Sequence, residues 1–160
     1  MLTAERLREL LSYDPETGVF TWLVIRGGAK ADKPAGTVKR DGYRWIRVDC
    51  RGYVDGRLAW LYMTGQWPKH SIDHKNCNSV DCSWDNLREA NLSQQAANQR
   101  IRKNHATGFK GVHRSKDRFV ARIWRHNRYD YVGTYDTAEQ AHSAYMLEAI
   151  KLHGEFARAA

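Results

Sequence analysis

Long hydrophobic runs and an even set of cysteines are both missing from this 160-residue sequence. No stretch approaches the roughly 18 consecutive apolar residues of a membrane-spanning helix, so a membrane protein is not predicted. Three cysteines, Cys50, Cys77 and Cys82, cannot form the even disulfide framework of a small secreted domain. Segment 1–11 is charged and lacks the apolar core of a signal peptide. We therefore expect a cytoplasmic protein with no membrane partner.

Low-complexity tracts and internal repeats are also absent, and the chain has only three prolines. Hydrophobic residues make up 42% and charged residues 28%, which predicts a folded rather than a disordered chain. The length allows one ordinary domain or two small ones.

The net charge of +8 is unevenly distributed. Residues 1–98 hold 14 basic and 12 acidic side chains, a net of +2, whereas residues 99–160 hold 12 and 6, a net of +6. An excess of positive charge in the last part of the chain suits contact with phosphate, but it also suits a plain basic surface. Charge alone leaves both interpretations open.

Hydrophobic periodicity and turn residues predict two groups of short elements in an α+β chain. Helices are expected at residues 3–12, 57–64, 92–102 and 137–153, and strands at 19–25, 43–48, 109–113, 118–125 and 129–134. The polar segment 71–86 predicts irregular structure, and 103–108 predicts a linker. Trp22 and Trp45 are expected in the core.

Asp73 and His74 form the first pair of residues that points to a chemistry. A carboxylate can bind a hard divalent ion, and a neutral imidazole can take a proton from an attacking water. Adjacent Asp and His residues are common, and a structural role is the ordinary expectation for such a pair. The surrounding residues decide whether a catalytic role is favoured for Asp73 and His74.

Several motifs around this pair occur in the order found in HNH endonucleases of phages and mobile introns. They are Arg57-Leu58-Ala59-Trp60, Gly65-Gln66-Trp67-Pro68, Ile72-Asp73-His74 and Asn86-Leu87-Arg88, within about residues 53–98. The segment therefore resembles that family. The resemblance implies a ββα-metal fold, in which two strands and a helix hold one divalent metal, Mg²⁺ or Mn²⁺.

The resemblance also implies roles for individual residues in a homing-type phage enzyme that hydrolyses phosphodiester bonds. His74 would be the general base and Asp73 a metal ligand, while Asn86 would orient the His74 ring or brace the loop. Arg88 would contact phosphate in DNA, or form a surface salt bridge instead.

The sequence departs from the family pattern at the second metal ligand. Gln95 stands where the family usually has Asn, and Asn98 lies three residues later on about the same helix face. Either amide is a candidate ligand. A further departure is Gly56, which stands where the family often has His.

The pair Cys77 and Cys82 leaves two interpretations open. With His70 or His74 they could bind a structural Zn²⁺, because thiolate and imidazole suit that ion. The spacing is not that of a standard zinc finger, so reduced, packed cysteines are the favoured interpretation.

Residues 109–156 resemble the APETALA-type (ethylene-response-factor) DNA-binding domain, a three-stranded antiparallel sheet packed on one helix. The matching runs are Gly111-Val112, Ala121-Arg122-Ile123, 132–141 and Ala144-Tyr145. Alternation along the second strand predicts that Phe119, Ala121 and Ile123 face the helix, and that Val120, Arg122 and Trp124 face outward.

The resemblance implies that the outward face enters the major groove of double-stranded DNA. The positions that match its contacts are Lys110, His113, Arg122, Trp124 and Tyr131. The basic segment with Arg100, Arg102 and Lys103 would follow the DNA backbone.

These observations predict an N-terminal segment packing on the nuclease (1–40), an HNH nuclease domain (41–102) and a DNA-binding domain (108–158). The function expected is a DNA endonuclease that nicks as a monomer or cuts both strands as a dimer. Two alternatives stay open. One is a DNA-binding regulator that has lost catalysis, as Gln95 would suggest, and the other is an RNA-binding module.

Overall fold

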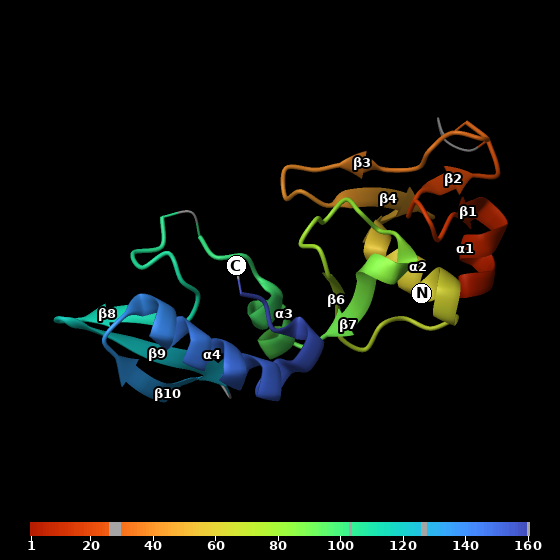
Figure 1. Ribbon diagram of the computed structural model, residues 1–160. Coiled ribbons are helices and arrows are strands. Elements are labelled where there is room, and N and C mark those ends of the chain that lie inside the picture. The colour runs from red at the N-terminus through yellow and green to blue at the C-terminus, as the bar shows by residue number, and fades with distance from the viewer. Residues whose placement is uncertain (26–29, 103, 126–127, 160) are drawn as a thin grey trace. The chain divides into compact units, whose positions relative to one another are not determined.

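The computed structural model describes residues 1–25, 30–102, 104–125 and 128–159 (Figure 1). The chain forms two compact units, Met1–Ala90 and Asn91–Ala160. The boundary between them falls inside the predicted nuclease domain, 41–102, so the two units are not the predicted domains. The predicted domain limits remain predictions.

The first unit is built from two helices and several short antiparallel strands. Its elements are α1 (Ala4–Leu10), β1 (Leu11–Tyr13), β2 (Phe20–Trp22), β3 (Thr37–Val38), β4 (Arg44–Val48), β5 (Arg51–Val54), α2 (Asp55–Thr64), β6 (Ser71–His74), the 3-10 turn η1 (Trp84–Asn86) and β7 (Leu87–Ala90).

Helix α1 begins at the predicted cap but ends earlier than predicted. The Thr3 hydroxyl accepts a hydrogen bond from the Arg6 amide, which satisfies one of the unpaired amides at the helix start. At Leu11 the backbone becomes extended and pairs with Trp22 in the β1–β2 hairpin. Pairing with β2 thus replaces the last turn of the predicted helix.

The core of the first unit gathers side chains from both helices and from β1, β2 and β4. The members with almost no exposed surface include Leu7, Leu11, Phe20, Ile46, Leu58 and Leu61. Burying one such side chain contributes roughly 1.5–3 kcal/mol. The N-terminal segment therefore contributes Leu7, Leu11 and Phe20 to this core, and its packing on a nuclease domain remains a prediction.

Strands β3, β4 and β5 form an antiparallel sheet with β4 in the middle. Trp22 packs against the core as predicted, but the prediction for Trp45 is wrong. Trp45 is half-buried outside the core, where its indole nitrogen donates to Asp41 and the Lys39 ammonium lies 4.1 Å from its ring centroid.

Helix α2 confirms the helix predicted at residues 57–64. It ends at Gly65, whose φ of 76° is a left-handed conformation that favours glycine. Its first turn contains the fully buried Asp55, whose Oδ1 accepts the Gly56 amide at 2.8 Å.

The prediction of irregular structure at 71–86 is wrong at its start. Residues 71–74 form β6, which pairs with β7 so that Asp73 lies opposite Arg88 and His74 opposite Leu87. The strands carry buried polar residues, so the apolar alternation that predicts a strand is missing here.

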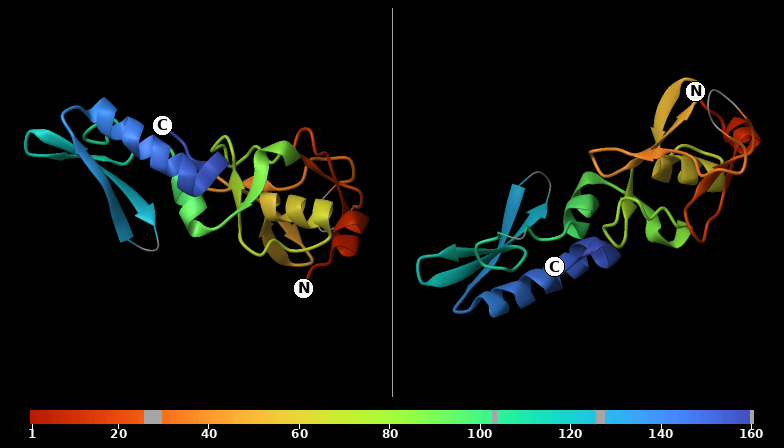
Figure 2. Two further views of the ribbon diagram at one scale, coloured as in Figure 1. Left: turned by 60° about the horizontal axis from the view of Figure 1, so that its bottom comes forward. Right: turned by 90° about the horizontal axis from the view of Figure 1, so that it is seen from above.

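The second unit holds a three-stranded sheet covered on one face by a long helix. Its elements are α3 (Leu92–Asn98), β8 (Val112–Ser115), β9 (Arg118–Arg125), β10 (Arg128–Tyr135), α4 (Ala138–His153) and η2 (Gly154–Phe156). The strand order is β10-β9-β8, all antiparallel, and α4 runs across the sheet (Figure 2). The predicted sheet and helix are therefore confirmed.

A separate core joins that sheet to α4. Val112, Ala121 and Ile123 from the strands pack with Ala141 and Tyr145 from the helix. Val120 is only 7% exposed, although it alternates with Arg122 and Trp124 along β9. It pairs with His113 and Thr134 in the neighbouring strands and is not a member of the core that joins the sheet to α4.

Among the described residues, no helix combines the length and the apolar character needed to cross a membrane.

Candidate nuclease site and DNA interface

The carboxylate of Asp73 lies against the guanidinium of Arg88. Arg88 Nε donates to Asp73 Oδ2 at 2.9 Å, and both residues are buried. Their opposite positions in the β6–β7 register produce this contact. Arg88 thus forms an ion pair, although a buried one rather than the surface pair considered from sequence. Its contact with phosphate remains a prediction.

His74 is the next residue on β6, and its ring is turned toward the protein interior. The residue is 7% exposed, and its Nε2 lies 3.6 Å from the Cys82 sulfur. Burial lowers the pKa of His74, and the charges of Asp73 and Asp81 oppose that shift only in part. The ring is therefore held in the neutral form that a general base requires.

Asn86 braces the loop that follows β6. Its Oδ1 accepts the Asn76 amide at 3.0 Å, and its Nδ2 donates to the Asp81 carbonyl at 2.7 Å. The Lys75 amide also donates to the Asn86 backbone carbonyl at 2.9 Å. These bonds correspond to the second of the two roles that the resemblance implied for Asn86.

The two candidate amide ligands, Gln95 and Asn98, lie on α3 in the second unit. Helix α3 starts with a capping box, in which Asn91 and Gln94 each bond the backbone of the other. Gln95 is half-buried and Asn98 is buried. Their role as metal ligands remains a prediction.

The described residues contain no group of three or more His, Cys, Asp or Glu side chains arranged to hold a metal. The zinc set considered from sequence, Cys77 and Cys82 with His70 or His74, is thus not assembled there. The predicted site for a divalent metal differs from such a group, because its ligands would be one carboxylate and the oxygens of side-chain amides. Those hard donors suit Mg²⁺ or Mn²⁺.

The turn between β3 and β4 supplies a residue that the sequence did not indicate. The Tyr43 ring centroid lies 6.2 Å from that of His74, and Tyr43 is 38% exposed. The Ser79 hydroxyl donates to the Gly42 carbonyl at 2.6 Å, which fastens the turn to the loop after β6. An exposed aromatic ring therefore stands beside His74.

The β1–β2 hairpin supports the same loop from another side. The Tyr13 hydroxyl donates to the Cys82 carbonyl at 2.6 Å. Gly18 has a φ of 71°, and a Cβ there would lie 2.2 Å from the carbonyl carbon of Cys82. The close approach of two backbones explains why glycine occupies the position.

In the second unit, the predicted DNA contacts on the sheet share one face. Arg122 lies opposite Tyr131, Trp124 lies opposite Tyr129, and residues two apart on a strand point the same way. Trp124, Tyr129 and Tyr131 are 38%, 62% and 65% exposed, and His113 and Arg122 are also exposed. Exposed rings on this face are unusual for a plain solvent surface.

The remaining predicted contacts lie at or near the end of α3. Lys110 donates from its ammonium to the Ala97 and Gln99 carbonyls, which caps that helix end. A DNA contact by Lys110 remains a prediction and would compete with these bonds. Arg100 and Arg102 are exposed, and Lys103 lies outside the described residues.

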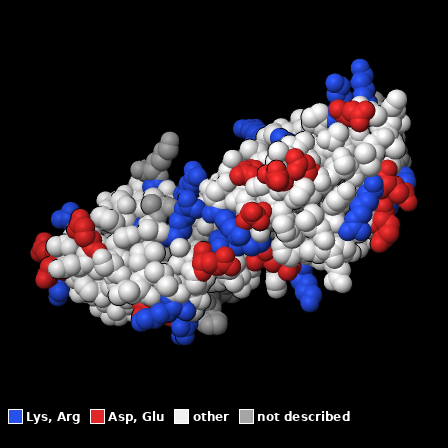
Figure 3. Space-filling view, turned by 45° about the vertical axis from the view of Figure 1, so that its right-hand side comes forward, with Lys and Arg blue, Asp and Glu red and all other residues white. Residues whose placement is uncertain are grey.

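Charge is distributed rather than concentrated on the face drawn in Figure 3. There, Lys and Arg side chains are interspersed with Asp and Glu. The excess of positive charge in the second unit follows from composition, with 12 basic and 6 acidic residues after Ala90.

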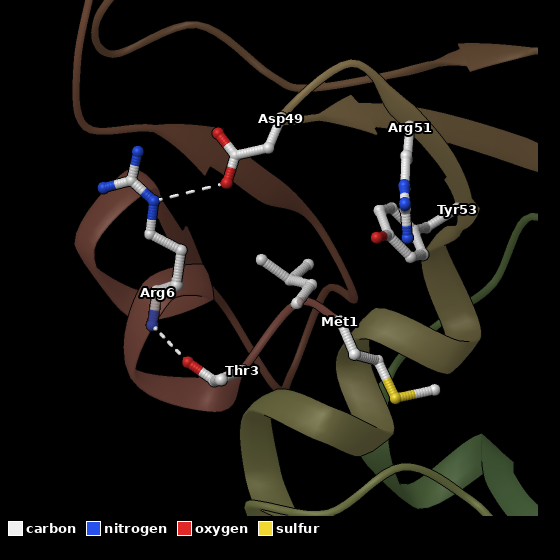
Figure 4. A pocket seen from close by; sticks show the side chains of 7 residues that line it. Met1, Thr3, Arg6, Asp49, Arg51 and Tyr53 are labelled. Atoms are coloured by element: carbon white, nitrogen blue, oxygen red, sulfur yellow. Dashed lines mark hydrogen bonds and ion pairs between the residues drawn. The ribbon is translucent and has the colours of Figure 1, made fainter.

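A surface pocket of about 450 Å³ lies in the first unit, apart from the predicted site residues (Figure 4). Arg6 and Arg51 line it, but Asp49 accepts a hydrogen bond from Arg6 Nε at 3.3 Å. The lining residues include none of the predicted catalytic or metal-binding residues.

Comparison with known proteins gives one match. A family model described as HNH endonuclease matches residues 56–97, a segment that contains Asp73, His74, Asn86, Arg88 and Gln95. No curated protein and no solved structure matches the chain. The family match supports an HNH nuclease domain in this part of the chain.

Proposed function

We propose that this chain is a metal-dependent endonuclease that binds duplex DNA and hydrolyses a phosphodiester bond. The observation that carries the proposal is the adjacent, buried pair Asp73 and His74 at the end of β6, within the segment that matches the HNH family model. A homing-type enzyme of phage origin is the narrower form of the proposal, and it rests on the resemblance alone.

In this proposal His74 takes the proton from the attacking water, and its lowered pKa keeps the ring neutral near pH 7. Arg88 holds the Asp73 carboxylate in place from across the hairpin. Asn86 fixes the loop that closes the site.

Asp73 would be a ligand of the divalent metal, and the family resemblance alone implies Gln95 or Asn98 as its second ligand. A bound Mg²⁺ or Mn²⁺ would supply positive charge to the phosphate and lower the pKa of a bound water. Tyr43, which stands exposed beside His74, would meet the DNA near the reacting bond.

The second unit would bind the duplex through its sheet. Support for this comes from the shared exposed face of His113, Arg122, Trp124 and Tyr131 and from the positive charge of residues after Ala90. Arginine and aromatic side chains of this kind contact base edges and phosphates in duplex DNA.

The first test is cutting of supercoiled plasmid in Mg²⁺ or Mn²⁺. We expect nicked or linear product from the native protein and none after EDTA is added. His74→Ala should abolish cutting, while His70→Ala, which changes an exposed histidine of the same unit, should not. Equal cutting by both variants would refute the assignment of His74.

The alternative is a DNA-binding regulator without catalysis, which the Gln95 departure favours. It predicts duplex binding with no cutting in either metal. If the native protein does not cut, Gln95→Asn shows whether the metal site is the cause. Restored cutting in this variant would place the defect in the metal site.

A further inference from the structure

Cys82 is a buried thiol that the proposed chemistry does not use. It has no exposed surface, and its sulfur lies 3.6 Å from Nε2 of His74. Its backbone is fixed from behind by the Tyr13 hydroxyl and by the close approach of Gly18. The backbone that carries the thiol is therefore held in one place.

Gly56, in the first turn of helix α2, lies beside this contact. A Cβ at Gly56 would lie 3.7 Å from both the Cys82 sulfur and His74 Nε2. A larger side chain would have to enter the space that the thiol and the imidazole occupy. The glycine thus permits a direct contact between sulfur and ring nitrogen.

Asp55 provides a second buried group next to the thiol. Burial raises the pKa of Asp55, and its interaction with the Cys82 thiol opposes that rise. Its Oδ1 accepts the Gly56 amide, whereas its Oδ2 is fully buried and has no hydrogen-bond partner among the described residues. A buried carboxyl oxygen without a partner is costly, so a nearby donor should turn toward it.

The Cys82 thiol has one proton, and that proton could be directed either to the Asp55 carboxyl group or to the His74 ring. Burial, with the charge of Asp55 next in importance, raises the pKa of Cys82, so the sulfur stays protonated at neutral pH. A carboxylate oxygen can only accept a hydrogen bond, whereas the imidazole Nε2 accepts or donates according to its tautomer. With S–H directed to Asp55, the sulfur lone pairs face Nε2.

We propose that Cys82 is a positioning residue for His74, with its sulfur accepting a hydrogen bond from Nε2–H and Asp55 orienting the thiol. This contact fixes the ring in its Nε2–H tautomer. If the chain is a nuclease as proposed above, the proton from water then enters at Nδ1. Cys82 touches no reacting atom and acts through the ring.

The test is the tautomer of His74 in the full-length, metal-free protein, measured by ¹⁵N NMR of the ring nitrogens. The sample contains EDTA at about pH 8, above the ordinary pKa of histidine. His74→Gln assigns the signals. We expect a single Nε2–H tautomer in the native protein, both tautomers in Cys82→Ala, and the native pattern again in Cys82→Ser, because a hydroxyl can replace the acceptor.

Cys50→Ser is the matched control, since Cys50 is exposed, and it should leave the ring signals unchanged. If circular dichroism shows that Cys82→Ala is unfolded, Cys82→Val replaces it, because valine fills the site without donor or acceptor. An unchanged single tautomer in the folded Ala or Val variant would overturn the proposal. So would a mixture of tautomers in the native protein.

Plasmid cutting provides a second, separate readout. Residues that orient a reacting ligand or base typically change activity by about 10–100-fold. We expect kcat to fall by that factor in Cys82→Ala, with KM unchanged, and to recover in Cys82→Ser. Because the NMR measurement needs neither metal nor cutting, the Cys82 inference can be decided even if the native protein does not cut DNA.

Discussion

At the scale of single residues, the buried ion pair of Asp73 and Arg88 gives the most direct stability prediction. Arg88→Met should lower the free energy of unfolding by about 3 kcal/mol, because the carboxylate of Asp73 would be left buried without its partner. Urea unfolding measures the change.

The matched control is Arg118→Met, which removes an exposed pair with Asp136 in the second unit. Its side chains are 54% and 80% exposed, so the loss should be at most about 1 kcal/mol. If both variants lost the same free energy of unfolding, burial of the Asp73–Arg88 pair would not add to its contribution to stability.

The lowered pKa of His74 predicts a pH dependence of stability. The folded protein disfavours the charged ring, so its contribution is fully present above the unfolded pKa of about 6.5 and is lost as pH falls through the lower, folded value. Native protein should therefore lose stability faster than His74→Gln as pH falls below about 6.5. Urea unfolding in EDTA across that range measures the difference, and parallel curves would contradict the prediction.

How far the site could be predicted differs from residue to residue. Asp73, His74 and Asn86 were recognisable because their order along the chain carries the pattern. Asp55 and Tyr43 were not, since Asp55 comes near Cys82, and Tyr43 near His74, only through folding. Cys82 was noticed for its sulfur, but sequence spacing could not show that its neighbour would be an imidazole rather than a zinc ion.

At the scale of elements, the turn between β1 and β2 supports the loop after β6. Gly18→Ala should destabilise the first unit by several kcal/mol, because the new Cβ would overlap the Cys82 backbone and the residue has a positive φ. Thermal or urea unfolding checks the loss.

Gly65→Ala is the control for conformation alone. Gly65 has a similar φ of 76°, but nothing lies within 4 Å of the added Cβ. The expected loss is about 1–2 kcal/mol. If the two variants were equally stable, the contact between Gly18 and the Cys82 loop would have no energetic weight.

Elements with regular patterns were predictable and those with buried polar residues were not. Helix α4 and strands β9 and β10 show clear periodicity, and their predicted ranges were close to those found. Strands β6 and β7 carry Asp73, His74 and Arg88 at buried positions. Because these residues are polar, their sequence predicts a loop rather than strands. Asp73 and Arg88 are partners from opposite strands, and the pairing of β6 with β7 explains why these residues form strands.

At the scale of the whole molecule, the proposal places the Asp73–His74 pair in the first unit and the duplex-binding sheet in the second. Trp124→Ala combined with Tyr131→Ala should weaken duplex binding about tenfold, as expected for losing contacts worth roughly 1–3 kcal/mol, and leave kcat unchanged. His74→Ala should abolish cutting and leave duplex binding unchanged. Fluorescence anisotropy with a labelled duplex measures the binding.

Leu147→Ala serves as the control for the sheet variant, because Leu147 is 62% exposed on α4 and belongs to neither core. It should bind DNA as the native protein does. Tighter binding of single-stranded RNA than of duplex DNA by the native protein would instead support the RNA-binding alternative.

The support that Tyr13 and Gly18 give to the Cys82 loop bears on how the segment that matches the family model could be produced as a minimal fragment. The family match begins at residue 56, and a fragment cut at that border would retain Asp73, His74, Asn86 and Cys82. It would lose Tyr13, Gly18 and the whole β1–β2 hairpin, along with Leu7, Leu11 and Phe20 of the core. Such a fragment would keep the motif residues but lack the hairpin and core side chains that support the Cys82 loop. We therefore expect that a folded minimal fragment must start at α1.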